Sequence, residues 1–488
     1  MKREPSNPRQ PAVAKAKLLR SVLTVAALLS TAGSLAAAPA KASPGARAAR
    51  PAALEAPAPA GAEVRQSRCG EEDALPSSSV RDASMIDTAV VDPRTQLQQL
   101  VQRALERSQS VGAVTLLAQA ARNDWEETRA SRLPQVNLGG TLAQTGVKSG
   151  DLPLTSGSKG TISVNVSAPL FDSGRLEKLA AWRSQLAESA RLGLINTEQQ
   201  LALQTVALAM DRSRFQLQIQ IYGQYVRKMA CLVDALEIIV KADRGRSSEL
   251  VQAQKNRQQA ELSVEQTHSA LRQTEIRLRR MVGDELPPSA SYSALLTQVP
   301  DLAEMQRDIE SSPEVAQLAA QQQAQSRYAE SVAAGYRPQV NLLLNGAAIV
   351  GQGKGADVLA GVNVSMPLFN AGADPAISAA RKRAEAVRLQ REDTIEARRY
   401  RLADIHESAV SAFDRSRRIV EILRGSDRLR AATLQQWQQL GRRSLFDVMG
   451  SEADYYGLRV AHVNAIFDGQ QAVALMWSMG RGVMTPLR

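Results

Sequence analysis

The stretch VNVSAPLFDSG at residues 164–174 decides the fold, because it returns as VNVSMPLFNAG at 362–372. Each copy follows a second shared phrase, which is RLPQVNL at 132–138 and YRPQVNL at 336–342. Both phrases keep their order, and the second copy of each follows the first after roughly 200 residues. The chain therefore contains one long unit twice.

A third shared phrase supports the duplication, with GRSSEL at 245–250 and GRRSLF at 441–446. A unit of this length far exceeds a solenoid repeat. The 488 residues would allow two or three ordinary domains, but the duplication predicts one body with two similar halves. We expect the repeats to span 93–283 and 301–488, with a Pro-containing connector at 284–300.

Apolar and polar residues alternate beside these phrases, and this alternation predicts strands with one apolar and one polar face. In the first repeat Ile162 and Val164 are apolar, whereas Thr161 and Ser163 between them are polar. The second repeat alternates in the same way. We expect β-hairpins at 135–170 and 339–368, with linking loops rich in Gly and Ser at 146–160 and 351–355.

Each alternating run is about ten residues long, which is the length of a membrane-spanning strand. A half-buried sheet in a soluble protein would show the same alternation. Both hairpins, however, are bracketed by Pro and by long helical segments, with no further strands to pack on. Four strands cannot close a barrel, and open sheet edges do not survive in lipid. If these strands span a membrane, several chains must share one barrel.

Helical patterns fill the rest of each repeat. Segments 93–131 and 301–335 precede the strands and end before a proline, which disfavours helix in the residue before it. After the strands we expect a helix of about 70 residues and then a shorter one, joined at a tip near Gly245 in the first half and Gly441 in the second. Their richness in Gln, Arg and Ala suits long antiparallel helical hairpins packed side by side.

The N-terminus has the pattern of a secretory signal over 1–42, with a basic start, a short apolar core and an A-x-A site at 40–42. An Ala/Pro-rich stretch at 43–92 is typical of a disordered leader. The net charge of +11 falls to +5 without 1–42, which hold seven Lys/Arg and one Glu. The basic pI therefore does not indicate nucleic-acid binding.

Residues suited to catalysis or metal binding are few and scattered. His268, His406 and His462 each stand alone in a helical segment. Cys69 and Cys231 form no metal motif, and whether they pair stays open. The glycine-rich segment 351–355 lacks the Walker spacing. We therefore expect no enzyme, no cofactor and no metal.

The order of helix, Pro, strand hairpin, Pro-Leu-Phe-x-x-Gly and long helical hairpin, given twice, resembles the TolC-type outer-membrane channel family. The resemblance covers about 93–485 and implies a mainly α fold with membrane β-structure. It also implies a homotrimer, in which each protomer gives four strands to a shared twelve-stranded outer-membrane barrel. The helical hairpins would then form a tunnel in the periplasm, and outer-membrane lipid would surround the strands.

The resemblance also assigns residues to places. Pro169, Pro367, Gly174 and Gly372 would mark the junction between barrel and tunnel, and the tips would lie at the periplasmic end.

At the second tip, Arg443 matches the family's gate arginine, and Arg442 and Asp447 lie beside it. Two positions depart from the family, because Gly450 and Val251 stand where well-known members carry acids. Glu249 could substitute for the acid of the first tip.

The family implies an exit duct for an inner-membrane pump, driven by ATP or protons, with a periplasmic adaptor of the membrane fusion type. Many drug-efflux members are lipoproteins, and this chain shows no lipobox. We therefore favour type I protein secretion of a toxin-like cargo, as in an adenylate cyclase toxin exporter. Multidrug or metal efflux is the alternative, and a periplasmic adaptor or structural coiled coil is a more remote one.

Overall fold

The computed structural model describes residues 92–147, 155–288, 291–351, 353–440 and 444–488. The expected signal at 1–42, nearly all of the leader, Cys69 and the tip residues Gly441, Arg442 and Arg443 lie outside the described residues.

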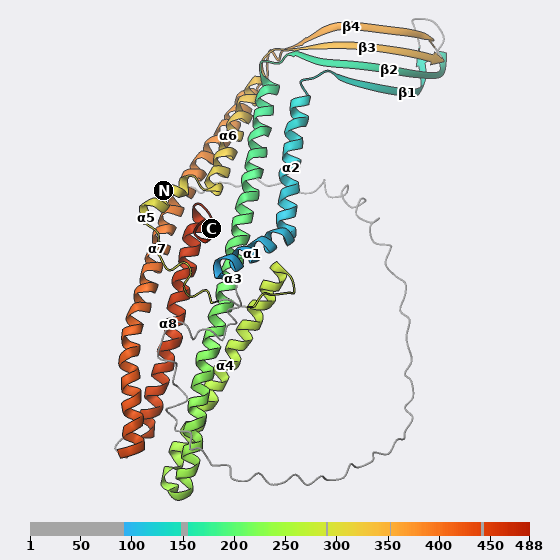
Figure 1. The fold of residues 1–488 in the computed structure, drawn as a ribbon. Helices are drawn as coiled ribbons and strands as arrows, with labels where there is room; N and C mark the ends of the chain where they lie inside the picture. Colours follow the sequence, from blue (N-terminus) through green and yellow to red (C-terminus); the bar gives the residue numbers. More distant parts are fainter. Residues whose placement is uncertain (1–91, 148–154, 289–290, 352, 441–443) are drawn as a thin grey trace, which may run out of the picture. The chain divides into compact units, whose positions relative to one another are not determined.

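Both halves show the same order of elements, with two helices, two strands, a very long helix and a shorter helix (Figure 1). The elements of the first half are α1 Pro93–Arg107, α2 Gln109–Ala130, β1 Gln135–Val147, β2 Thr155–Phe171, α3 Arg175–Ala242, the 3₁₀ turn η1 Arg244–Arg246 and α4 Ser247–Val282. Those of the second half are α5 Leu302–Glu310, α6 Pro313–Ala334, β3 Gln339–Gly351, β4 Gly355–Ser365, α7 Ala373–Leu440, α8 Leu445–Met479 and the 3₁₀ turn η2 Thr485–Leu487. The helices α3 and α7 each contain 68 residues, which gives each a length of about 100 Å.

The segments expected as single helices before the strands are each broken into two. Ser108 adopts an extended conformation between α1 and α2, and its hydroxyl accepts a hydrogen bond from the Val111 N–H at 3.3 Å. In the second half the break falls at Ser311 and Ser312, and Pro313 begins α6. A capping serine and an N1 proline both favour a new helix start, and these local signals override the continuous apolar pattern.

The four strands form a single antiparallel sheet in the order β1-β2-β3-β4, so the two hairpins join through the β2–β3 pair. The strands are 13, 17, 13 and 11 residues long, and β1 and β2 extend into the segment 146–160 that was expected to be a loop. The hairpin expected to end at 368 ends instead at Ser365. Among the described residues, β1 and β4 each pair on one side.

The two faces of the sheet differ as the alternation predicts. Asn137, Asn165 and Asn345 lie opposite one another in one row, and the Asn345 amide donates to the Asn165 side-chain oxygen. The adjacent row, on the other face, brings Leu138 opposite Val164. Directly opposed residues share a face, so one face carries the asparagines and the hydroxyl residues of β1 and β2, while the other carries aliphatic side chains. In β3 and β4 the asparagine face also contains Leu343, Ile349 and Leu359.

The helices pack as two long hairpins, α3 with α4 and α7 with α8, while α6 contacts both α3 and α7. Among the described residues, no helix is long and apolar enough to cross a membrane.

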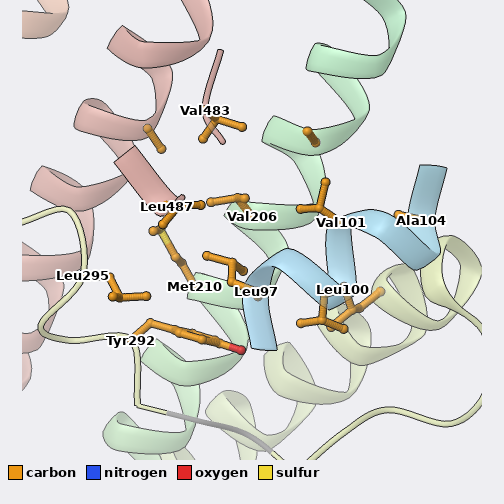
Figure 2. Packing of buried hydrophobic residues seen from close by; sticks show 14 of the residues in the cluster. Leu97, Leu100, Val101, Ala104, Val206, Met210, Tyr292, Leu295, Val483 and Leu487 are labelled. Atoms are coloured by element: carbon orange, nitrogen blue, oxygen red, sulfur yellow. The ribbon is translucent and has the colours of Figure 1, made fainter. Parts of the chain in front are cut away.

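Near the middle of α3, the largest apolar cluster joins α1, α3, the connector and the C-terminal segment (Figure 2). The Gln470 amide fixes the connector there by donating to the carbonyl groups of Tyr292, Ser293 and Leu295 at 2.6–2.9 Å. The Tyr292 hydroxyl donates to Gln96 at 2.7 Å, and burial raises the pKa of Tyr292 to about 12. The connector is thus part of the core.

A second apolar cluster lies toward the tips and takes residues from all four hairpin helices, among them Leu236 of α3, Ala253 of α4, Leu434 of α7 and Leu445 of α8. The first hairpin therefore packs directly on the second within one protomer.

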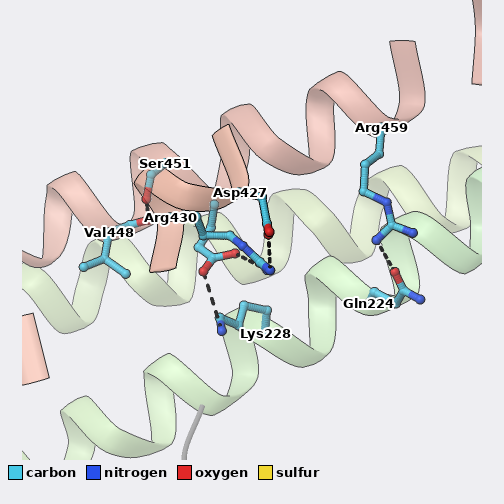
Figure 3. A network of polar contacts seen from close by, with 8 residues as sticks. Gln224, Lys228, Asp427, Arg430, Val448, Ser451 and Arg459 are labelled. Atoms are coloured by element: carbon cyan, nitrogen blue, oxygen red, sulfur yellow. Dashed lines mark hydrogen bonds and ion pairs between the residues drawn. The ribbon is translucent and has the colours of Figure 1, made fainter. Parts of the chain in front are cut away.

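Charged side chains are buried beside this cluster (Figure 3). Glu452 of α8 is fully buried, with its carboxylate 3.5 Å from the Lys228 ammonium of α3 and 3.4 Å from the Arg430 guanidinium of α7. Arg430 also contacts Asp427 at 3.0 Å and covers the Tyr455 ring at 4.2 Å. We call Lys228, Arg430 and Glu452 the buried triad; it links the two hairpins through charge as well as through apolar contact.

Removing the carboxylate of the triad should destabilise the protein, because the buried Lys228 ammonium and the half-buried Arg430 guanidinium would lose the anion between them. We expect Glu452→Gln to lower the free energy of unfolding by about 3 kcal/mol. Guanidinium unfolding of the purified protein, followed by helical circular dichroism, measures this change. Glu421→Gln, at an exposed position of α7, is the matched control. Equal stability of the two variants would contradict the role of the triad.

Candidate functional site

The repeated Pro-Leu-Phe-x-x-Gly phrase builds the same turn in both halves. The Asp172 carboxylate accepts a hydrogen bond from the Gly174 N–H at 3.1 Å, and the Asn370 amide oxygen accepts one from the Gly372 N–H at 2.9 Å. An Asp or Asn that bonds the backbone two residues later forms a compact turn. This turn converts strand β2 into helix α3, and it precedes helix α7.

The two glycines serve different backbone needs. Gly174 has a φ of 79°, which places it in the left-handed region, where any side chain would be strained. Gly372 does not have a positive φ. The expected equivalence of these junction residues thus holds for the turn but not for the backbone conformation.

The two junction prolines also differ in position. Pro169 lies inside β2 at a bulge, opposite Asn341, and beyond the last pair of β1 and β2 at Gln135 and Ser167. Among the described residues, no strand lies beside Pro169 on the side of β1, so a missing backbone donor there costs little. Pro367 lies two residues past the end of β4.

Ser173 ties the two halves together at this level. Its hydroxyl donates to the Pro338 carbonyl at 2.9 Å, and its φ of 55° is uncommon for a residue with a side chain. The sequence pattern did not single out Ser173, because the corresponding residue of the second repeat is Ala371.

The first tip differs from expectation in what ends the helix. Asp243 leaves the helical conformation, with φ −131° and ψ 95°, and its carboxylate accepts from the Gly245 N–H at 3.0 Å. Gly245 then lies within a 3₁₀ turn without a positive φ. An aspartate cap, not the flexibility of glycine, therefore makes this turn.

At the second tip, Ser444 begins α8 by accepting the Phe446 N–H at 3.1 Å. Leu445 is fully buried in the apolar cluster, whereas Phe446 is 49% exposed. Asp447 lies exposed in the first helical turn, where a negative charge favours the helix dipole.

The acid proposed for the first tip already has a partner on its own hairpin. The Glu249 carboxylate lies 2.8 Å from the Arg246 guanidinium. Val251 is 64% exposed, and a Cβ at Gly450 would meet nothing within 4 Å. Both positions that depart from the family are thus open surface positions.

The buried triad was not among the residues that the sequence predicted as functional. A signal was available, because each charged residue lies one turn from large apolar side chains in its own helix. Lys228 has Leu232 four residues on, and Glu452 has Val448 four residues before it and Tyr456 four after. A charge within an apolar stripe predicts a buried ion pair, but the sequence does not say which helices meet.

The family model of outer membrane efflux proteins matches residues 100–284, all but the last of which lie in the first repeat. No curated protein matches the chain.

Several solved structures share the fold of this chain. CusC is 17% identical with a TM-score of 0.71, covering 79% of this chain and 92% of that one. The VceC outer membrane protein of Vibrio cholerae is 15% identical with a TM-score of 0.68, covering 79% of this chain and 96% of that one. The open state of the MtrE outer membrane channel of Neisseria gonorrhoeae is 15% identical with a TM-score of 0.69, covering 79% of this chain and 88% of that one. The family model thus matches part of the chain, and the solved structures share its fold, as the resemblance to TolC-type channels predicts.

Proposed function

We propose that this chain is the exit duct of a tripartite export system, with its strands in the outer membrane and its helices in the periplasm. The amphipathic four-stranded sheet carries the proposal. Its aliphatic face exposes Leu138 by 76% and Leu142 by 90%, which suits lipid contact. Its other face carries the asparagine row, which suits a polar lumen. A matching family model over 100–284 supports the same reading.

The open edges of the sheet support a homotrimer. Within one chain β1 and β4 have no second neighbour among the described residues, and lipid tolerates no open edge. The sheet would close into a barrel if β1 of each copy paired with β4 of the next copy. A bacterial barrel needs at least about eight strands, so two copies would suffice arithmetically. The choice of three copies, and hence twelve strands, rests on the family.

The duct would work with a periplasmic adaptor and an inner-membrane pump, driven by ATP or protons. Our first candidate is type I secretion of a toxin-like protein. Multidrug or metal efflux is the second candidate. The remote candidate, a periplasmic adaptor or structural coiled coil, does not account for the amphipathic sheet.

Deleting the gene should separate the candidates. We expect the deletion to remove one or a few proteins from the culture medium and to leave drug and metal susceptibility unchanged, because a dedicated secretion duct handles one cargo. Quantitative proteomics of the medium and growth-inhibition assays measure the two effects. Complementation with the intact gene is the control. Raised susceptibility with an unchanged set of secreted proteins would favour efflux instead.

We further propose that charges at the second tip keep the duct closed at rest. In a trimer, three copies of Arg442, Arg443 and Asp447 would converge near one axis, where like charges repel unless each arginine finds an acid. Partly exposed ion pairs contribute only about 0.2–1 kcal/mol each, which suits a gate that an adaptor must open. Glu249 is a weaker candidate acid, because Arg246 already binds it.

Breaking these pairs should open the gate partly. We expect Arg443→Ser and Asp447→Ala each to raise the resting conductance in planar bilayers several-fold. Arg424→Ser removes an exposed charge from α7 away from the tip and should conduct like wild type.

Gly450→Asp should increase cation selectivity, because it adds one acid per protomer at a position with room for a side chain. Reversal potentials in a salt gradient measure this change.

The conductance test can also contradict the electrostatic gate. If the Arg443 and Asp447 variants both conduct like wild type, apolar packing around Leu445 closes the tip, and the electrostatic gate is wrong.

A further inference from the structure

A cavity of about 530 Å³ lies between the strand-proximal parts of α3, α6 and α7. Its charged lining residues are Lys178, Glu330, Arg337, Arg381, Glu385 and Arg388. None of these residues belongs to the tips or to the repeated junction turn.

Both carboxylates of this cavity are already neutralised by cations. Glu330 lies 2.7 Å from the Lys178 ammonium and 3.2 Å from the Arg327 guanidinium. The hydrogen bond from Lys178 is the main cause that lowers the pKa of Glu330, which is therefore ionised at neutral pH. Glu385 binds Arg388 at 2.6 Å, and Arg388 also reaches Glu392 at 2.6 Å.

Two arginines of the cavity lining are not used in these ion pairs. In the described part of the chain, the side chains of Arg337 and Arg381 make no ion pair and no hydrogen bond, and both are exposed. The charged groups in and beside the cavity thus give a local excess of two positive charges. The five cations are Lys178, Arg327, Arg337, Arg381 and Arg388, and the three carboxylates are Glu330, Glu385 and Glu392. Lys382 and Arg383 directly follow Arg381 and are also exposed, so they extend the positive surface.

The cavity lies at the level where the strands begin. Arg337 is followed by Pro338 and the first residue of β3, and Ser173, two residues after the end of β2, also lines the cavity. Arg381 comes eight residues after the start of α7, about 12 Å along the helix. If the strands span the outer membrane, these arginines lie at the height of the periplasmic leaflet.

The cavity also opens on the side of α7 that carries α5. Arg381, Ala384 and Arg388 follow one another at helical spacing and continue into Arg391 and Ile395 on the same face. Further along that face, Arg399 pairs with Glu310 of α5. In the proposed duct the interior must stay clear, so the side of α7 on which α5 packs is the outer side. The cavity lies on that side at Arg381–Arg388, between the α5 contact and the strands, where lipid headgroups have access.

We propose that this cavity binds the phosphodiester headgroup of an anionic phospholipid from the periplasmic leaflet, through Arg337 and Arg381. The proposal rests on the proposed membrane placement of the strands. A guanidinium group binds phosphate oxygens through paired charge-assisted hydrogen bonds, and both arginines are free to do so. Basic clusters beside a membrane attract anionic lipids. Gln322 and Ser326 in the lining supply polar groups for a headgroup hydroxyl.

The test uses the full mature protein in detergent and titrates it with phosphatidylglycerol or phosphatidylcholine, with bound lipid counted by native mass spectrometry. We expect wild type to prefer phosphatidylglycerol, and the double variant Arg337→Gln with Arg381→Gln to bind it about tenfold more weakly. Arg418→Gln with Arg424→Gln removes the same charge from exposed positions of α7 away from the cavity and should bind like wild type.

Competition identifies the source of the phosphate. We expect inorganic phosphate at the lipid concentration to leave phosphatidylglycerol bound, and soluble glycerophosphoglycerol to compete weakly. Displacement by equimolar inorganic phosphate would overturn the lipid assignment in favour of a free-phosphate site.

Insertion into planar bilayers separates this proposal from the function on which it rests. Wild type that inserts and conducts, yet binds both lipids equally, would overturn the headgroup site alone. Wild type that fails to insert would overturn the membrane placement, and the headgroup site with it.

Discussion

The rest of the molecule depends on one constraint, which is that the backbone groups on both outer edges of the sheet must find partners. Within one chain, β1 and β4 each have a strand on one side among the described residues. The sheet also exposes aliphatic side chains such as Leu142 and Val358, by 90% and 86%. Neither water nor lipid accepts both features, because water disfavours the apolar face and lipid disfavours the open edges. In the proposed trimer, association with further copies in a membrane would satisfy both demands at once.

The helical part answers a different demand, since two hairpins with helices of up to 68 residues must stay aligned over their length. Apolar burial near the tips supplies most of the attraction, because side chains such as Leu236, Leu445 and Val448 are fully buried there. The buried triad adds little net stability, since desolvation offsets most of its Coulomb attraction. Its contribution is to penalise any other register, in which Glu452 would be buried away from Lys228 and Arg430. We infer that apolar contacts hold the hairpins together and that the triad fixes their alignment.

The sequence predicted the large features of the fold because they repeat and have clear periods. Strict alternation identified the strands and their faces, and the duplicated phrases identified the two halves. The features that the sequence did not predict depend either on local hydrogen bonds or on contacts between distant parts of the chain. Ser108 and Asp243 redirect the chain through side-chain hydrogen bonds that apolar periodicity does not register. The triad and the contact of Ser173 with Pro338 join residues far apart in sequence, and no pattern within one helix or turn specifies such a partner.

The duplication preserved the arrangement of elements but not the interactions that hold them. Position 174 requires glycine because its φ is positive. Position 372 forms the same turn without a positive φ, so its backbone does not require glycine. The first tip closes on itself through Asp243 and the Arg246–Glu249 pair. The second tip begins with a serine cap and places Asp447 at the helix start. Two similar hairpins therefore present chemically different ends. Each tip carries two arginines, Arg244 and Arg246 in the first and Arg442 and Arg443 in the second, so the two ends differ in the acids and caps beside the arginines and not in arginine number.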